Sequence, residues 1–261
     1  MENKNDQMKA VKISIDYMKK NIDTEITSEE LAYLVGYSPY HFSRIFKEIT
    51  GVSPRHYLSA LRIEAGKEML ISSKSPSILK ILLLIGFKSL GTFGSKFKQF
   101  VGLSPKQFRL STNDLHDFVN QYKHKESPLL LVSTAPKLSC HLEVPPTFKG
   151  IIFVGLFPRA IPDQKPIIGT AFTQNQTSCV FSDIPPGTYY VLAAAFKWSV
   201  NPKDYFLLNR ALRGKYDKPI VITKTTEVEV TLSLRDPLPT DPPILVNLPQ
   251  LLFEQVKKKA N

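Results

Sequence analysis

Two short stretches, GVSPRHY at residues 51–57 and GLSPKQF at residues 102–108, carry the same pattern within one chain. In each stretch the glycine suits the left-handed position that ends a helix, and the serine suits the N-cap of the next helix. The proline suits the first turn of that next helix, because its φ angle is already set. Each stretch therefore predicts a junction between two helices, and the recurrence predicts a duplicated structural unit.

The similarity extends outward from these junctions. GYSPYHFSRIFKEITGVSPRHY (36–57) aligns with GFKSLGTFGSKFKQFVGLSPKQF (86–108) when one residue is inserted near Ser89. Each copy is expected to form a helix-turn-helix followed by a supporting helix. Matched positions, with the first copy named first, are Gly36 and Gly86, Phe42 and Phe93, Phe46 and Phe97, Lys47 and Lys98, and Pro54 and Pro105.

The surrounding residues predict further helices. Thr27 and Glu30 have the spacing of a capping box, so we expect a helix to begin after Thr27. The helix that starts at Pro54 should run to about Ile71 and be ~27 Å long. Successive major grooves on one face of a duplex lie roughly 34 Å apart. This helix is therefore long enough to hold two reading helices near adjacent grooves.

Basic charge is concentrated around the duplicated units. The formal net charge of the chain is +11, and residues 36–110 hold twelve Lys and Arg against three Asp and Glu, a net charge of +9. This concentration favours contact with nucleic-acid phosphates. The phenylalanines of both copies recur at i, i+4 spacing, so we expect them in the core rather than stacked on bases.

The remaining composition restricts the class of protein. The polar N-terminus predicts no signal peptide, and Lys80 interrupts the longest apolar run, so we expect no membrane association. Two cysteines without paired spacing predict neither a disulfide framework nor a zinc site, which suits a cytoplasmic protein.

Proline use divides the chain, with four prolines in residues 1–127 and sixteen in residues 128–261. In the second part, GIIFVGLF (150–157), EVEVTLSL (227–234) and FSDIPPGTYYVLAAA (181–195) have the patterns of strands and a turn. The expected fold class is multidomain, α then β: an all-α double helix-turn-helix domain followed by an antiparallel β-sandwich domain. Further strand-like stretches lie at 129–134, 138–144, 167–173 and 219–223, and a basic amphipathic helix is expected at 248–260.

Signs of catalysis are weak. Cys140 and His141 are neighbours on an expected strand, so their side chains should point to opposite faces and cannot form a dyad. The sequence has no nucleophile elbow, zinc-protease motif, phosphate-binding glycine loop or carboxylate pair. We therefore expect no enzymatic activity, no metal site and no cofactor.

Residues 8–110 resemble the AraC/XylS family of transcriptional regulators. The resemblance is carried by LAYLVGYSPYHFSRIFKEITGVSPRHYL (31–58), LRIEAGKEML (61–70) and IGFKSLGTFGSKFKQFVGLSPKQFR (85–109). It implies that Tyr40, Ser43 and Arg44 read bases, with Arg44 foremost because a guanidinium pairs bidentately with guanine. His41 and Lys47, together with the capped starts of the helices at Pro54 and Pro105, are expected near phosphates.

The second copy departs from the pattern of that family. Gly91 and Gly94 occupy its expected reading helix and should weaken it by about 1 kcal/mol each relative to alanine. We expect this copy to contact phosphates and read shape, with little discrimination between bases. The positions that keep a hydrogen-bond donor or a charge are Thr92, Ser95, Lys96 and Lys98.

After residue 110, the sequence predicts a linker or short helix at residues 111–128 and a domain at residues 129–261. FSDIPPGTYYVLAA together with VEVTLSL is similar to carboxypeptidase-regulatory-like, prealbumin-like sandwiches. Such a domain would bind an effector or mediate oligomerisation. Its aromatic residues form either a ligand pocket or ordinary core, and the pocket candidates are Tyr189, Tyr190, Phe196 and Trp198.

Three functional hypotheses remain open at this stage. The first is a sequence-specific regulator that binds double-stranded DNA and is modulated by the second domain through a small-molecule effector or self-association, as a monomer or homodimer. The second makes that domain a protein-interaction module without a ligand, for example one that contacts RNA polymerase. The third is an architectural DNA binder of low specificity.

Overall fold

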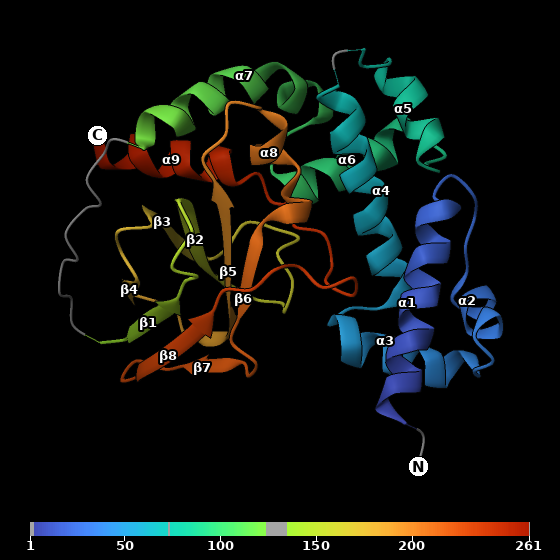
Figure 1. The fold of residues 1–261 in the computed structure, drawn as a ribbon, viewed down its shortest axis with the longest axis horizontal. Helices are drawn as coiled ribbons and strands as arrows, with labels where there is room; N and C mark the ends of the chain where they lie inside the picture. The colour runs from blue at the N-terminus through green and yellow to red at the C-terminus, as the bar shows by residue number, and fades with distance from the viewer. Residues whose placement is uncertain (1–2, 73, 124–134, 261) are drawn as a thin grey trace. The chain divides into compact units, whose positions relative to one another are not determined.

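The computed structural model describes residues 3–72, 74–123 and 135–260, which divide into two compact units. The first unit consists of Met1–Leu110 and Leu238–Leu245, and the second consists of Ser111–Pro237 and Val246–Asn261. Figure 1 shows the helices of the first unit in blue to green and the strands of the second in yellow to red. A short segment late in the chain, Leu238–Leu245, therefore belongs to the first unit, although the residues on either side of it belong to the second.

The first unit confirms the predicted duplication. Two helix pairs have the same lengths, 7 residues followed by 12 residues. A 17-residue helix, α4, stands between the pairs and provides the expected spacer, with a rise of about 26 Å. The helices are α1 (Lys4–Lys20), α2 (Ser28–Leu34), α3 (Pro39–Thr50), α4 (Pro54–Leu70), α5 (Ile78–Leu84), α6 (Leu90–Val101) and α7 (Pro105–Tyr122).

The predicted local signals form the helix boundaries. Thr27 Oγ1 accepts a hydrogen bond from the Glu30 backbone N–H at 3.1 Å, and a Glu30 carboxylate oxygen accepts one from the Thr27 N–H at 2.8 Å, which completes the capping box. Ser38 Oγ and Ser53 Oγ cap α3 and α4 by accepting hydrogen bonds from the backbone N–H groups of His41 and His56, each at 3.4 Å. The glycines at the matched turns and helix ends all have positive φ, namely Gly36 (+75°), Gly86 (+74°), Gly51 (+85°) and Gly102 (+90°).

The phenylalanines that recur at i, i+4 spacing in both copies are buried, as predicted. Phe42, Phe46 and Phe93 each expose 1% or less of their surface. Phe97 also makes an edge-to-face contact with Phe108 of α7, with ring centroids 5.5 Å apart. The phenylalanines are therefore core residues that set the angle between the helices of each copy.

A segment after the last strand packs against the spacer helix within the first unit. We call residues 238–245 the strap. The Lys67 ammonium of α4 donates hydrogen bonds to the carbonyl oxygens of Ile244 (3.3 Å) and Leu245 (3.4 Å). The Tyr57 hydroxyl donates to the Asp241 carbonyl oxygen at 2.9 Å. These contacts make the strap part of the helical unit.

Burial perturbs Lys67. Only 1% of the residue is exposed, and removal of its ammonium from water lowers the pKa from 10.5 to about 8, with Glu64 opposing this by its negative charge. The strap carbonyls partly replace the lost water, because a buried charge needs hydrogen-bond partners.

The second unit contains two sheets whose facing sides form one core. The first sheet has the order β4–β1–β8, and the second has the order β3–β2–β5–β6, with β7 also paired to β5. The strands are β1 (Lys137–Glu143), β2 (Gly150–Phe157), β3 (Ile168–Thr173), β4 (Ser178–Ser182), β5 (Gly187–Lys197), β6 (Leu212–Lys215), β7 (Ile220–Ile222) and β8 (Glu227–Ser233).

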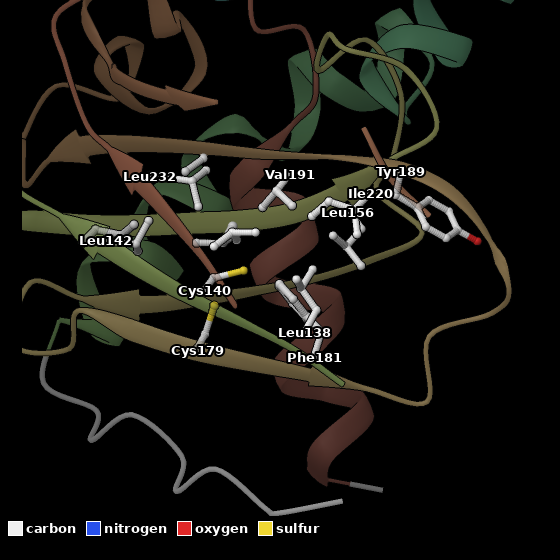
Figure 2. Packing of buried hydrophobic residues seen from close by; sticks show 14 of the residues in the cluster. Leu138, Cys140, Leu142, Leu156, Cys179, Phe181, Tyr189, Val191, Ile220 and Leu232 are labelled. Atoms are coloured by element: carbon white, nitrogen blue, oxygen red, sulfur yellow. The ribbon is translucent and has the colours of Figure 1, made fainter. Parts of the chain in front are cut away.

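Buried residues from both sheets interdigitate between them, which makes the unit a sandwich (Figure 2). Cys140 of β1 lies directly opposite Cys179 of β4 in the strand register, and both are free thiols. A hydrogen bond with Cys179 and burial raise the pKa of the Cys140 thiol. His141 is exposed while Cys140 is buried, so the expectation that they point to opposite faces is confirmed.

The sandwich differs from the expected one in one pairing. The pairings among the described strands are antiparallel except that of β1 with β8, which is parallel. A parallel neighbour is available because the chain runs through the whole second sheet before β8 returns beside β1. The expected strand at 129–134 lies outside the described residues.

Helices cover the other face of the second sheet. Residues 111–122, which we expected to form a short helix or a linker, are the last two thirds of α7 in the structure. Its Leu115, Val119 and Tyr122 recur at helical spacing and are buried, and the Tyr122 hydroxyl donates to the Ala171 carbonyl of β3 at 3.2 Å. The predicted C-terminal helix is confirmed as α9 (Leu248–Ala260), and Phe253 contacts Phe118 of α7 at 5.1 Å between ring centroids.

Short elements between β5 and β6 have no counterpart in the sequence analysis. These are α8 (Lys203–Phe206) and the 3₁₀ helix η1 (Leu208–Arg210). Their buried aromatic residue Tyr205 donates a hydrogen bond from its hydroxyl to Asn120 of α7 at 2.6 Å. Elements of three or four residues have too little periodicity to be predicted from sequence.

The matched glycines Gly36 and Gly86 offer a controlled test of the packing between the two copies. Both have positive φ, so alanine should cost about 1 kcal/mol of unfolding free energy at either position. A Cβ at Gly86 would also lie 2.7 Å from the Ile22 carbonyl oxygen, whereas one at Gly36 would meet nothing within 4 Å. Urea denaturation should therefore show a clearly larger loss for Gly86→Ala than for Gly36→Ala. Equal losses would contradict the close approach at Gly86.

Lys67 predicts a pH dependence of stability. Between about pH 8 and 10.5 the unfolded chain keeps this proton while the folded protein releases it, so the free energy of unfolding should rise with pH by up to about 3 kcal/mol. Urea denaturation of the parent chain and of Lys67→Met across this pH range measures the effect. The free energy of unfolding of the parent chain should rise relative to that of Lys67→Met over this pH range, because methionine has no proton to release. Parallel pH profiles would contradict the buried, hydrogen-bonded ammonium.

Candidate nucleic-acid interface

Helix α3 presents the polar side chains that the sequence analysis assigned to the first copy. Phe42, Ile45 and Phe46 bury one side of α3, and the helical period turns the remaining positions outward. Tyr40 is 83% exposed, and Arg44 and Lys47 are also exposed. His41 and Ser43 are half-buried, and the His41 ring contacts Tyr37 of the preceding turn.

Arg44 makes a local ion pair on the helix surface. Its Nη1 lies 3.0 Å from Glu48 Oε1, and its Nη2 lies 3.3 Å from His41 Nδ1. Both partners of the ion pair are about half exposed, and such surface pairs contribute at most about 1 kcal/mol. A bidentate contact with guanine contributes about 1–3 kcal/mol of discrimination. The ion pair with Glu48 would therefore cost Arg44 little to give up if its guanidinium bound a ligand instead.

Helix α6 presents a different surface. Thr92, Ser95 and Lys98 are exposed, while Lys96 is half-buried with its ammonium 5.5 Å from the Phe100 ring centre. The Thr92 hydroxyl accepts a hydrogen bond from Ser89 Oγ at 2.9 Å, within the N-terminal cap of the helix. Two of the four predicted side chains are thus already engaged locally.

The glycines of α6 leave its outer face open. A Cβ built at Gly91 or Gly94 would meet no atom within 4 Å. Neither glycine is therefore needed for packing inside the unit. Without side chains, the helix backbone itself is accessible to a closely approaching ligand.

Helix α5 and the start of α6 carry exposed apolar side chains. Leu79 and Leu83 of α5 are each 61% exposed and lie on one face of that helix, and Leu84 and Leu90 are also exposed. The continuous apolar run ILLLIGF contains no polar residue to mark its outer face, so the sequence pattern does not separate its buried residues from its exposed ones.

The candidate ligand residues of the second unit separate into two groups. Trp198 and Phe196 line an open pocket of about 1040 Å³ within that unit. Tyr189 lies instead in the core between the sheets, and its hydroxyl donates to the Pro185 carbonyl at 3.0 Å. Tyr190 is half-buried on β5 and is absent from the pocket lining.

The described residues provide no cluster of three metal-binding side chains. Within the same ranges, no helix is both long and apolar enough to cross a membrane.

With this geometry in place, the chain can be compared with known proteins. Residues 31–111 match the sequence family described as a helix-turn-helix domain. The bifunctional transcriptional activator/DNA repair enzyme AdaA of Bacillus subtilis is 33% identical over 99 residues, which cover 38% of this chain and 46% of that protein. The uncharacterized HTH-type transcriptional regulator YobQ of the same organism is 31% identical over 96 residues, covering 37% and 39% of the two chains.

Solved structures match the same part of the chain. An AraC-type DNA-binding regulator from Chromobacterium violaceum is 27% identical and covers 40% of this chain and 92% of that chain, with a TM-score of 0.38. The C-terminal domain of AraT, a response regulator from Geobacillus stearothermophilus, is 31% identical, covering 39% and 84%, with a TM-score of 0.37.

These matches concern the helical unit. This chain spans less than half the length of the curated relatives it matches. Residues 31–111 therefore form a helix-turn-helix domain, and they lie almost entirely within the stretch, 8–110, on which the resemblance rested.

We expect the Arg44 side chain to determine which base the protein prefers at one position of the duplex. Arg44→Ala should weaken binding to the preferred duplex by about 1–3 kcal/mol and relax preference at one base pair, because the bidentate contact is lost. Competition binding against duplexes substituted at each position measures both effects. Unchanged selectivity would mean that α3 is not oriented with Arg44 toward base edges.

Lys98 provides the contrasting case. It is exposed on the last turn of α6, and we expect it to contact a phosphate. Such a contact carries no sequence information. Lys98→Ala should weaken binding to all duplexes alike and reduce the slope of log affinity against log salt by about one unit. A salt titration with preferred and scrambled duplexes checks this, and a loss confined to one sequence would assign Lys98 to base reading instead.

Proposed function

We propose that the protein is a sequence-specific transcription regulator that binds double-stranded DNA through α3 and α6. The observation that carries this proposal is the pair of equal helix-turn-helix units separated by the 17-residue helix α4. One chain then supplies the two reading helices that dimeric repressors supply from two subunits. The net charge of +9 on residues 36–110 adds the phosphate attraction that such a complex needs.

The two units contribute unequally in this proposal. Helix α3 carries Tyr40, Ser43 and Arg44 toward base edges, and Lys47 and His41 toward phosphates. Helix α6 contributes mainly backbone and phosphate contacts through Thr92, Ser95 and Lys98, because Gly91 and Gly94 leave no side chain to distinguish bases. The operator should therefore show strong preference in one groove and weak preference one helical turn away.

The second unit modulates DNA binding in this proposal. Two chain segments support it: α7 runs from the second helix-turn-helix into the second unit, and the strap belongs to the first unit although both its ends continue into the second. The modulating signal is an effector or self-association. The alternative is that the second unit binds no ligand and instead contacts a protein such as RNA polymerase.

One observation favours a second candidate function, an architectural DNA binder of low specificity. The bare outer face of α6 suits close contact with a groove without base reading. Selection of sites from a random duplex pool with the full-length protein, at two salt concentrations, separates the two functions. An enriched motif supports the regulator, whereas binding that only collapses with rising salt supports the architectural role. The full chain is required, because removal of the strap would take away the two carbonyl partners of Lys67.

A further inference from the structure

The pocket of the second unit lies where β5 ends. Phe148, Phe196 and Trp198 contribute to its lining, along with the segment Leu207–Leu212 that leads into β6. Trp198 is the only tryptophan of the sequence and is half-buried. A volume of about 1040 Å³ accommodates a small organic molecule, and aromatic lining residues offer an apolar body a place to pack.

The charged residues of the lining favour an anion. Four cationic side chains face two carboxylates, and one of those carboxylates, Asp204, already accepts a hydrogen bond from Ser199 Oγ at 2.6 Å. Guanidinium and ammonium groups bind carboxylate, sulfonate and phosphate groups by charge-assisted hydrogen bonds. The cationic residues are Lys197, Lys203, Arg210 and Arg235, and the carboxylates are Asp204 and Asp236.

One wall of the pocket is bonded to α7. The Ser199 carbonyl oxygen lies 3.1 Å from His116 Nε2, and the Tyr205 hydroxyl joins the Ser199 backbone N–H (2.8 Å) to Asn120 (2.6 Å). The same helix begins in the first unit, where its Phe108 packs against Phe97 of α6. A shift of the Trp198–Ser199 segment would therefore displace α7, and α7 is the helix that packs against α6.

Another part of the lining leads into the strap. Leu234, Arg235 and Asp236 line the pocket, and the strap begins two residues later at Leu238. The carbonyl oxygens of Ile244 and Leu245 in the strap accept hydrogen bonds from Lys67 of the spacer helix α4. Of the three points at which the chain passes from one unit to the other, the one before the strap thus directly follows residues of the lining, and the one within α7 belongs to a helix that is hydrogen-bonded to Ser199 of the lining.

We propose that this pocket binds an amphipathic organic anion, and that its occupancy is coupled to DNA binding through α7 and the strap. The second part rests on the proposed function as a DNA-binding regulator. Coupling requires that the ligand and the duplex each favour one arrangement of these two segments, either the same one or different ones. The ligand then changes the affinity for DNA by the same factor by which DNA changes the affinity for the ligand.

The ligand class is tested with two probes that share one aromatic body and differ by a sulfonate group, anilinonaphthalene sulfonate and the neutral N-phenylnaphthylamine. Energy transfer from Trp198 to the bound probe reports probe that is bound near the pocket. The sulfonate should bind more tightly to the full-length protein than the neutral probe. Equal affinities would overturn the assignment of an anion.

Matched variants locate the site. Arg210→Gln should weaken sulfonate binding by about fivefold to tenfold, because it removes one exposed cation of the lining. Lys218→Gln removes an exposed cation outside the lining and should leave the affinity unchanged. An equal response of the two variants would overturn the placement of the site.

The coupling is tested with a duplex obtained by the site selection above. The sulfonate probe should change the DNA affinity by a certain factor, and the duplex should change the probe affinity by the same factor. Probe binding that leaves DNA affinity unchanged would overturn the coupling. A protein that binds the probe at Trp198 but binds no duplex would instead refute the proposed function, so the two failures are distinguishable.

Discussion

The packing around the single helix α4 is the constraint on which the helical unit depends. Residues on several sides of α4 are buried, including Tyr57, Ile63 and Leu70, so one helix serves as the core of both helix-turn-helix copies. Gly66 allows the close approach of the second copy, because a Cβ there would lie 3.1 Å from Ile85 and 3.4 Å from Phe93. The separation of the two reading helices is therefore set by rigid packing rather than by a flexible linker.

A buried ammonium completes this packing. Lys67 is a buried cation on α4. Its hydrogen bonds to the carbonyl oxygens of Ile244 and Leu245 hold the strap in one position along the helix. A buried polar group specifies a unique arrangement when its partners are present and is costly when they are absent. The strap and the helix are in this way mutually dependent, although they are more than 170 residues apart in the chain.

The two copies use the same scaffold with different surfaces. Their helix lengths, caps and left-handed glycines agree, whereas the outer faces diverge from polar side chains on α3 to glycines on α6. Residues that determine the scaffold are constrained by packing, while exposed positions vary with little effect on stability. Duplication followed by divergence of the outer face accounts for this combination of likeness and difference.

The sequence by itself determined the elements whose signals are local. The Thr27 capping box, the serine–proline junctions at Ser38 and Ser53, the repeated glycines and the alternating pattern of β8 all act within a few residues, so their pattern could be read without a fold. The candidates Tyr40 and Arg44 came instead from the resemblance to the AraC/XylS family, and both side chains are exposed on α3.

Only the tertiary structure decided which distant segments meet. The parallel pairing of β1 with β8, the opposition of Cys140 and Cys179, the extension of α7 into the second unit and the insertion of the strap depend on burial shared between residues far apart in the chain. Sequence spacing carries no signal for such contacts, because many arrangements bury the same apolar residues. The pocket around Trp198 belongs to this class, since its walls come from segments that only the sandwich brings together.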